Sequence, residues 1–195
     1  MIKSMTMAAL MAALTTGGYA ASFEVDAAHS SIGFGVKHMV VTTTKGSFAE
    51  FTGGFEYDAA DPTSLKAQAT VKVASIDTAN AKRDDHLRNA DFFDVATHPE
   101  ITFVSTGAEK VGDEVVLSGD LTIKGVTKAI KLPLTVNGPI TDPYGNVRVG
   151  LEGKTKINRQ DFGIVWSKTM DGGGLVVGDE VTLDIVIEGM QKKGE

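Results

Sequence analysis

Residues 114–136, EVVLSGDLTIKGVTKAIKLPLTV, decide the fold class of this 195-residue chain. Apolar side chains occupy alternate positions from Val115 to Ile123 and again from Ile130 to Val136, on either side of Lys124-Gly125-Val126. Alternation with a period of two is typical of a strand with one apolar and one wet face, and a glycine between two such runs indicates a hairpin turn. The stretch therefore predicts antiparallel β-sheet.

The same pattern recurs along the chain. Six further segments read as strands, at residues 32–36, 48–57, 65–73, 101–108, 147–152 and 181–188, which gives about eight strands in all. Turn sequences separate the runs at Val111-Gly112-Asp113, Asn137-Gly138-Pro139 and Asp142-Pro143-Tyr144-Gly145. Long strands joined by hairpins favour a closed meander over two stacked sheets. The predicted fold is all-β, an eight-stranded antiparallel up-and-down barrel.

One segment breaks the alternation. Asn80 to Asn89 is polar, lacks glycine and proline, and follows Asp77-Thr78, which can cap a helix. We predict a short helix after the strand end at Asp77-Thr78, with Phe92 and Phe93 packing its far end against the barrel.

Composition excludes several classes of protein. The chain has no cysteine, so disulfides, thiolate metal sites and cysteine nucleophiles are excluded. A net charge of −6 argues against binding a nucleic-acid backbone. No apolar run approaches 18 residues, so we expect no stable membrane insertion. The four histidines show no metal-binding spacing, and we predict neither a metal site nor a catalytic residue.

The first twenty residues resemble a secretory signal peptide. Lys3 precedes a small and apolar stretch from Met5 to Leu14, and Gly18-Tyr19-Ala20 fits a small-x-small cleavage site. The alternative is a buried N-terminal helix. We expect cleavage after Ala20, a single β-barrel domain at residues 21–195, and a periplasmic or secreted protein.

The pattern leaves open whether the barrel is filled. Ala67, Ala69, Gly119 and Gly153 fall at inward positions where a packed core would have larger side chains, which favours a cavity. The alternative is that these small residues face large ones across the core.

Several motifs, in order, resemble the YceI-like family of lipocalin-like polyisoprenoid-binding proteins of the bacterial periplasm. The longest is KRDDHLRNADFFD at residues 82–94, and the others lie at residues 25–34, 36–38, 46–51, 74–78, 98–103, 119–128, 142–145 and 157–163. The resemblance runs from about Ser22 to Gly189. Tyr144 stands where the family usually has tryptophan, and Met39-Val40 where Leu-Gly is common.

The resemblance implies a lipocalin-like barrel whose apolar pore holds one long isoprenoid chain, a polyprenyl lipid or a quinone, for storage or transport. It implies binding without chemistry, and no cofactor besides this ligand. A chain of roughly forty carbons, at about 0.3 kcal/mol per heavy atom, could reach on the order of 12 kcal/mol from apolar contact. The sequence leaves open whether the protein forms a homodimer.

Alternation selects the candidate lining residues, which are Ile32, Phe34, Val36, Val71, Val73, Phe103, Leu121, Ile123, Leu132, Leu134, Leu151, Leu183 and Ile185. His38 shares their parity and could meet a headgroup at one end, although a structural histidine is the simpler interpretation. Phe92 and Trp166 complete the set. Trp166 could stack on a ligand at the mouth of the barrel or be an ordinary half-buried tryptophan.

The charged run Arg83 to Arg88 has two further interpretations besides a solvated helix face. The helix could close the pore as a lid, with Leu87, Phe92 and Phe93 plugging one end. Alternatively, this run or His38 could serve an enzyme acting on a lipid or quinone. Two other functions also stay open: a carrier of a different amphiphile, such as a fatty acid or fatty amide, and a secreted interaction protein with a filled barrel.

Overall fold

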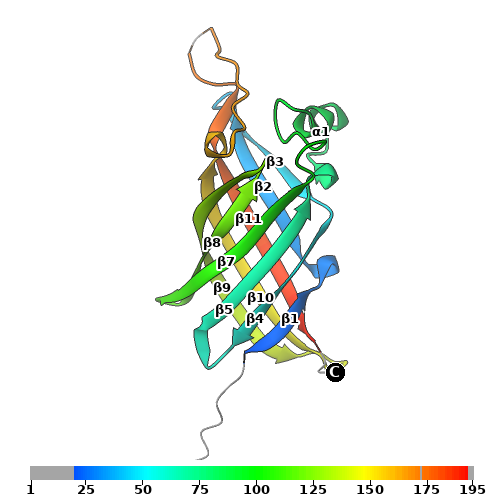
Figure 1. The fold of residues 1–195 in the computed structure, drawn as a ribbon, viewed down its shortest axis with the longest axis vertical. Helices are drawn as coiled ribbons and strands as arrows, with labels where there is room; N and C mark the ends of the chain where they lie inside the picture. The colour runs from blue at the N-terminus through cyan, green and yellow to red at the C-terminus, as the bar shows by residue number, and fades with distance from the viewer. Residues whose placement is uncertain (1–19, 172, 193–195) are drawn as a thin grey trace, which may run out of the picture.

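Antiparallel hydrogen bonding closes eight strands into a ring in the computed structural model, which describes residues 20–171 and 173–192 (Figure 1). The ring runs β1-β4-β5-β7-β8-β9-β10-β11, and β11 pairs back to β1. The strands are β1 (Ala21–Val25), β2 (Ser31–His38), β3 (Thr42–Phe48), β4 (Phe51–Asp58), β5 (Asp61–Lys72), β6 (Ile76–Asp77), β7 (Glu100–Val111), β8 (Glu114–Ile123), β9 (Val126–Thr141), β10 (Val147–Asn158) and β11 (Val177–Gln191). The predicted antiparallel up-and-down barrel is confirmed.

At two of the eight positions in the ring, the strand is interrupted and consists of two consecutive segments. The long strand β11 pairs with β1 at Val25–Gly189 and with β2 at Ile32–Ile185, so β1 and β2 continue one edge across the 3-10 helix η1 (Ala27–His29). β3 and β4 divide the next position in the same way, because β3 pairs with β2 and β4 pairs with β1.

The single strand that we predicted at residues 48–57 is wrong at its start. β3 ends at Phe48 and β4 begins at Phe51. The amide of Ala49 donates to the carbonyl of Ser75, and the amide of Glu50 donates to the Ser75 hydroxyl. These amides bind the 3-10 helix η2 (Val73–Ser75) instead of a neighbouring strand, which breaks the ladder.

The turn predicted at Asn137-Gly138-Pro139 is also wrong. β9 continues through these residues to Thr141, with Asn137 opposite Gly150 and Ile140 opposite Arg148. A register shift between Arg148 and Gly150 marks a bulge, which accommodates the proline that cannot donate to the ladder. The hairpin turns at Asp142–Asn146, which confirms the other predicted turn, and the Asp142 side chain accepts there from the amides of Tyr144 and Asn146.

The predicted short helix is present as α1 (Ala81–Arg88), but its cap differs from the prediction. The Asn80 side chain, not Asp77 or Thr78, accepts from the amide of Arg83 at 3.0 Å. The buried carboxylate of Asp84 instead accepts from the amide of Thr78 at 3.0 Å. None of the helices in the described part of the chain is long and apolar enough to cross a membrane.

Buried side chains form two clusters inside the ring. The first comprises Phe23, Phe55, Tyr57, Leu65, Val115, Leu117, Leu132, Leu134, Val149 and Leu151. The second, next to α1, comprises Phe48, Val71, Val73, Ile76, Phe92, Ile101, Leu121, Ile123, Phe162 and Ile164. Phe103 packs against both clusters, which places it near the middle of the barrel. The predicted signal peptide lies outside the described residues except for Ala20, so its cleavage and the domain boundary stay predictions.

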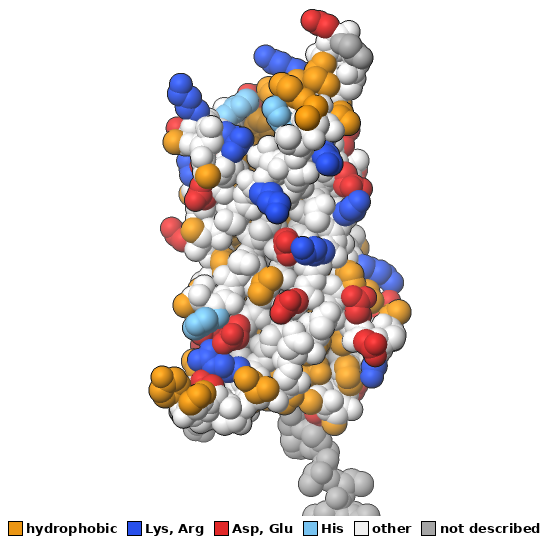
Figure 2. Space-filling model, turned by 180° about the vertical axis from the view of Figure 1, so that it is seen from behind, with side chains coloured by type: hydrophobic (Ala, Val, Ile, Leu, Met, Phe, Trp, Pro, Cys, Tyr) orange, Lys and Arg blue, Asp and Glu red, His pale blue; other side chains and the backbone are white. Residues whose placement is uncertain are grey.

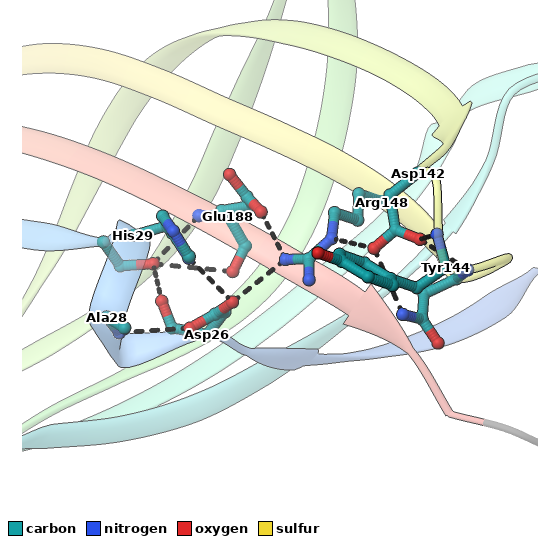
Figure 3. Close-up of polar contacts among 9 residues, drawn as sticks. Asp26, Ala28, His29, Asp142, Tyr144, Arg148 and Glu188 are labelled. Carbon is teal, nitrogen blue, oxygen red and sulfur yellow. Dashed lines mark hydrogen bonds and ion pairs between the residues drawn. The ribbon is translucent and has the colours of Figure 1, made fainter.

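A polar network joins three segments at the end of the barrel away from α1 (Figure 3). Arg148 on β10 donates to Asp26 at 2.9 Å, to Asp142 at 2.8 Å and to Glu188 on β11. Hydrogen bonds from His29 and Arg148 lower the pKa of Asp26 to about 2, and Arg148 holds the pKa of Asp142 well below its ordinary value. The bond to Asp26 raises the pKa of His29.

We expect Arg148→Met to lower the thermal unfolding midpoint by several degrees, because three carboxylates lose their shared partner. In the wild type, Asp26 stays charged below its ordinary pKa of 3.8, so its contribution is complete above about pH 4 and is lost as the pH falls towards 2. Unfolding measured from pH 7 to pH 2 should therefore be less acid-dependent in Arg148→Met.

Lys154→Met is the matched control on the same strand, because Lys154 makes an exposed ion pair with Asp184. Its unfolding free energy should change by no more than about 0.5 kcal/mol. An Arg148→Met protein with the midpoint and acid dependence of the wild type would contradict a stabilising role for the network.

Candidate ligand-binding site

An apolar cavity of about 230 Å³ runs along the inside of the barrel. Val25, Phe55 and Ile187 line it at the end near β1, and Leu87, Phe92 and Val177 line it at the end near α1. The ten residue steps along β11 from Val177 to Ile187 cover about 33 Å of strand, or about 25 Å along the axis of a barrel with ordinary strand tilt. So small a volume over such a length describes a narrow tube.

The wall of this tube offers almost nothing polar. Among the described lining residues, only Gln68, Thr155 and Arg159 carry polar side chains. The Thr155 hydroxyl donates to the carbonyl of Lys131 at 2.9 Å and is therefore already paired. A ligand in the tube would be held by apolar contact, with few groups to orient it.

Arg159 is paired just as completely. Its guanidinium donates to the Asp179 carboxylate at 2.9 Å and to the carbonyls of Ile164, Trp166, Val177 and Gly178. Burial lowers the pKa of Arg159 from its ordinary value, and the surrounding acceptors offset part of this effect. Arg159 ties the segment after β10 to the start of β11, and its donors are already engaged by protein acceptors.

Thirteen of the sixteen residues proposed from the sequence line the cavity. They are Ile32, Phe34, Val36, Val71, Phe92, Phe103, Leu121, Ile123, Leu132, Leu134, Leu151, Leu183 and Ile185. Alternation along continuous strands places twelve of them correctly, because each strand presents every second side chain to the inside, whereas Phe92 lies in the segment that follows α1. Their contact with a ligand stays a prediction.

The other three do not line it. β5 ends at Lys72, so Val73 lies in η2 and packs in the core beside Ile76 instead of following the strand parity. His38 is exposed at the last position of β2 and does not line the cavity, although Val177, which pairs with it, does. Trp166 packs against the rings of Phe92 and His86, both with ring centroids at 5.2 Å, and is not among the residues that line the tube.

Several lining residues were not proposed from the sequence. Ile101, Leu117, Ile130 and Ile187 continue inward parities already recognised, so a complete count of those strands would have included them. Phe162 and Ile164 follow β10 in and after the 3-10 helix η3 (Arg159–Phe162), where alternation carries no information.

Three phenylalanine rings lie over glycines and set the bore. A Cβ built on Gly46, Gly119 or Gly189 would stand 2.4 Å from a ring atom of Phe34, Phe103 or Phe55, respectively. Each ring therefore occupies the place of a missing side chain on another strand. The expectation that small residues leave a hole is confirmed for Ala67 and Ala69, which line the cavity, and is wrong for Gly119, which Phe103 covers.

Gly153 is small for another reason. A Cβ there would stand 2.2 Å from the carbonyl oxygen of Pro133, so a neighbouring strand backbone approaches it closely. The glycine permits this approach and opens no cavity.

The segment from α1 to Phe93 closes one end of the tube. Leu87, Phe92 and Phe93 all line the cavity, and the Phe93 ring meets Phe48 edge-on at 6.1 Å. Arg88 anchors the helix by donating to the carbonyls of Ala74 and Ile76, both at 2.9 Å. These contacts give the charged run of α1 a structural explanation.

The cluster of Asp26, His29 and Glu188 has side-chain atoms close enough together to suggest a cation site. The guanidinium of Arg148 already binds both carboxylates (Figure 3). A cation would have to displace this guanidinium, so we assign the cluster to the polar network described above.

Comparisons with known proteins agree on one family. The model of the YceI-like domain matches residues 23–189. Protein YceI of Salmonella newport (strain SL254) is 39% identical over 191 residues, which are 96% of each chain.

Solved structures give the same result. The structure of Burkholderia cenocepacia BcnA has a TM-score of 0.75 at 28% identity and covers 84% of this chain and 98% of its own. A Campylobacter jejuni YceI protein has a TM-score of 0.70 at 28% identity and covers 97% and 100%. A polyisoprenoid binding domain from Saccharophagus degradans has a TM-score of 0.67 at 19% identity, covers 89% and 99%, and at that identity supports the fold alone.

We expect Gly119→Ala to destabilise the fold by about 1–3 kcal/mol, because the new methyl group would overlap the Phe103 ring and the carbonyl of Val104. Gly107→Ala on β7 is the matched control, since a Cβ there meets nothing within 4 Å, and it should stay within about 0.5 kcal/mol of wild type. Urea unfolding measures both variants.

Phe103→Leu should restore part of the stability lost in Gly119→Ala, because the shorter side chain leaves room for the methyl group. Strictly additive effects of the two substitutions would show that the ring does not rest on the glycine.

Proposed function

The chain belongs to the YceI-like domain family, and from that premise we propose that its barrel binds one long apolar isoprenoid chain, a polyprenyl lipid or a quinone tail, for storage or transport. The observation that carries the proposal is the narrow apolar tube, lined from nearly every strand and with few polar side chains. A structural relative with the same fold is described as a polyisoprenoid binding domain, and we take the class of ligand proposed here from that description.

The shape of the tube favours a chain over a compact ligand. A cavity of about 150 Å³ accepts a benzene ring, and this one has about 230 Å³ spread along the barrel. A chain of about forty carbons exceeds this volume, so we expect binding to widen the tube or to leave part of the ligand outside. The movable groups would be the lid side chains Leu87, Phe92 and Phe93.

We place this activity in the periplasm or outside the cell, on the strength of the leader sequence at residues 1–20. In water an apolar chain needs a carrier, because its exposed surface is costly. The carrier proposal requires no catalysis. The groups that an enzyme could use, His38 and the run Arg83–Arg88, lie outside the tube or hold α1 in place.

The first experiment is to purify the protein from its native compartment, extract it with organic solvent and identify the extract by mass spectrometry. We expect one polyprenyl chain or quinone per protein. A stoichiometric fatty acid or fatty amide would replace the isoprenoid with another amphiphile. An empty extract together with no uptake of added polyprenyl lipid would contradict the carrier proposal.

A substitution at the wall should block the tube. Leu121→Trp puts an indole ring in place of a smaller aliphatic side chain in the wall, and we expect bound lipid to fall to about a tenth or less of the wild-type content. Asp120→Trp is the matched control, since Asp120 precedes Leu121 on β8 and faces solvent. Val71→Trp, on β5 two strands away in the ring, tests another part of the wall if Leu121→Trp folds poorly. Unchanged lipid content in folded Val71→Trp would mean that the tube does not hold the ligand.

Removal of the lid side chains should speed ligand exchange. In a Leu87→Ala, Phe92→Ala double variant we expect release to be about tenfold faster or more, because each tenfold corresponds to about 1.4 kcal/mol of lost contact. Lys82→Ala, an exposed substitution on the same helix, should leave the rate unchanged. Release as slow as in the wild type would place the exchange route elsewhere.

A further inference from the structure

The turn between β2 and β3 adopts a conformation that its residues disfavour. Met39 and Val40 have φ of 50° and 61°, and the amide of Val41 donates to the carbonyl of His38 at 3.1 Å. Two consecutive left-handed residues closing a hairpin make a type I′ turn, which strongly favours Asn-Gly. A β-branched residue such as valine is an outlier there. The chain therefore carries local strain at this turn.

The same residues expose apolar surface to water. The side chains of Met39, Val40 and Val41 are 43%, 71% and 81% exposed. A polar turn would relieve the strain and the exposure together, so folding alone does not explain these residues. Strain that persists at a surface points to a function of the side chains that cause it. We refer to Met39–Val41 as the apolar tip.

The apolar tip lies at the end of the barrel that carries α1 (Figure 1). Two cavity-lining residues lead to it: Val36 is three positions before Met39, and Val177 pairs with His38. The amide of Met39 also donates to the carbonyl of Val176 at 2.9 Å. The tip is therefore continuous with the wall of the tube.

Another exposed apolar side chain, outside the tip, lies at the same end. Val165 is 64% exposed and lies between the lining residue Ile164 and Trp166, which contacts the lid ring Phe92. Figure 2 shows hydrophobic side chains gathered at this end, with basic and histidine side chains next to them.

The chemistry of this end fits a lipid surface. The exposed cations Lys37, Lys45 and Lys168 lie on the strands or loop that adjoin the tip, and Asp171 is an exposed acid of the same loop. Of the neighbouring acids, Asp179 is engaged by Arg159. Protein interfaces favour aromatic residues, methionine and arginine and are depleted in lysine, so Met39 would suit such an interface but the bordering lysines would not. Aliphatic side chains bordered by lysines instead match the boundary of an anionic bilayer.

We propose that the apolar tip docks this end of the barrel on the surface of a bilayer that contains anionic lipid. Met39, Val40 and Val41 enter the headgroup region while Lys37, Lys45 and Lys168 meet anionic headgroups. An isoprenoid chain then passes between the bilayer and the tube without crossing water. The proposal rests on the proposed function and adds the surface from which the ligand is taken.

The decisive variant is Met39→Asn, Val40→Gly, which installs the sequence that the turn favours. It removes two of the three apolar side chains, leaves Val41 in place and relieves the strain, so it should unfold at a higher temperature than the wild type and cannot lose binding by misfolding. Ile140→Asn is the matched control, because Ile140 is a similarly exposed apolar side chain on β9, near the turn at Asp142–Asn146 away from the tip. Lys45→Glu and Lys168→Glu test the charge contribution.

The assay is flotation with phosphatidylethanolamine vesicles, with and without phosphatidylglycerol. We expect the wild type and Ile140→Asn to bind vesicles that contain phosphatidylglycerol, and less at high salt. The double variant should bind about tenfold more weakly or worse. The proposal is overturned if the wild type binds neither kind of vesicle, or if the double variant binds as tightly as the wild type. A wild type that ignores vesicles but forms dimers lost in the double variant overturns it and assigns the tip to a second copy.

Uptake of a prenyl alcohol separates this proposal from the function on which it rests. We expect the double variant to take up farnesol added from solution as the wild type does, and to take up farnesol from vesicles more slowly. If neither protein takes up farnesol from solution, the carrier function itself fails. If both take it up from solution and equally fast from vesicles, only docking through the tip fails.

Discussion

Closure of the hydrogen-bonded ring is the constraint on which the structure depends. β11 closes the ring by bonding to β10 on one side and to β1 and β2 on the other, while beyond β2 the sheet ends at β3 and β6, where β3 pairs with β6 only at Ser47 and Phe48. Because every ring strand is paired on both sides, its side chains divide strictly into an inner and an outer set. The inner set then has only one place to go, which is the tube and the two clusters around it.

The bore of the tube follows from contacts between large and small residues across strands. Phe34, Phe55 and Phe103 each lie over a glycine on another strand, so three bulky rings occupy space at the wall that glycine leaves free. The same arrangement explains how a barrel lined largely by apolar side chains can retain a cavity. The two buried clusters supply stability, and the cavity that runs between their side chains leaves room inside the barrel.

Hydrogen bonds give three buried or half-buried arginines a structural role. Arg148 holds the β1 end together, Arg88 anchors α1, and Arg159 ties the segment after β10 to β11. Each guanidinium is engaged by protein acceptors, which accounts for charged motifs that could suggest catalysis when read as sequence. The exposed tip at Met39–Val41 has no such structural account, and it lies where the tube approaches the surface.

The sequence by itself determined eight strand segments, their hairpin-joined order and most of the wall, because period-two alternation is local and survives wherever a strand is continuous. It did not show β1, most of β3, or β6. It also determined the family, through motifs spread along the chain. Only the tertiary structure decided where strands break or bulge. The amides of Ala49 and Glu50 turn to Ser75, a bulge carries β9 past Pro139, and η2 turns Val73 into the core. It alone also decided that Phe103 covers Gly119. Such events depend on partners distant in sequence, and a local pattern of polarity contains no record of them.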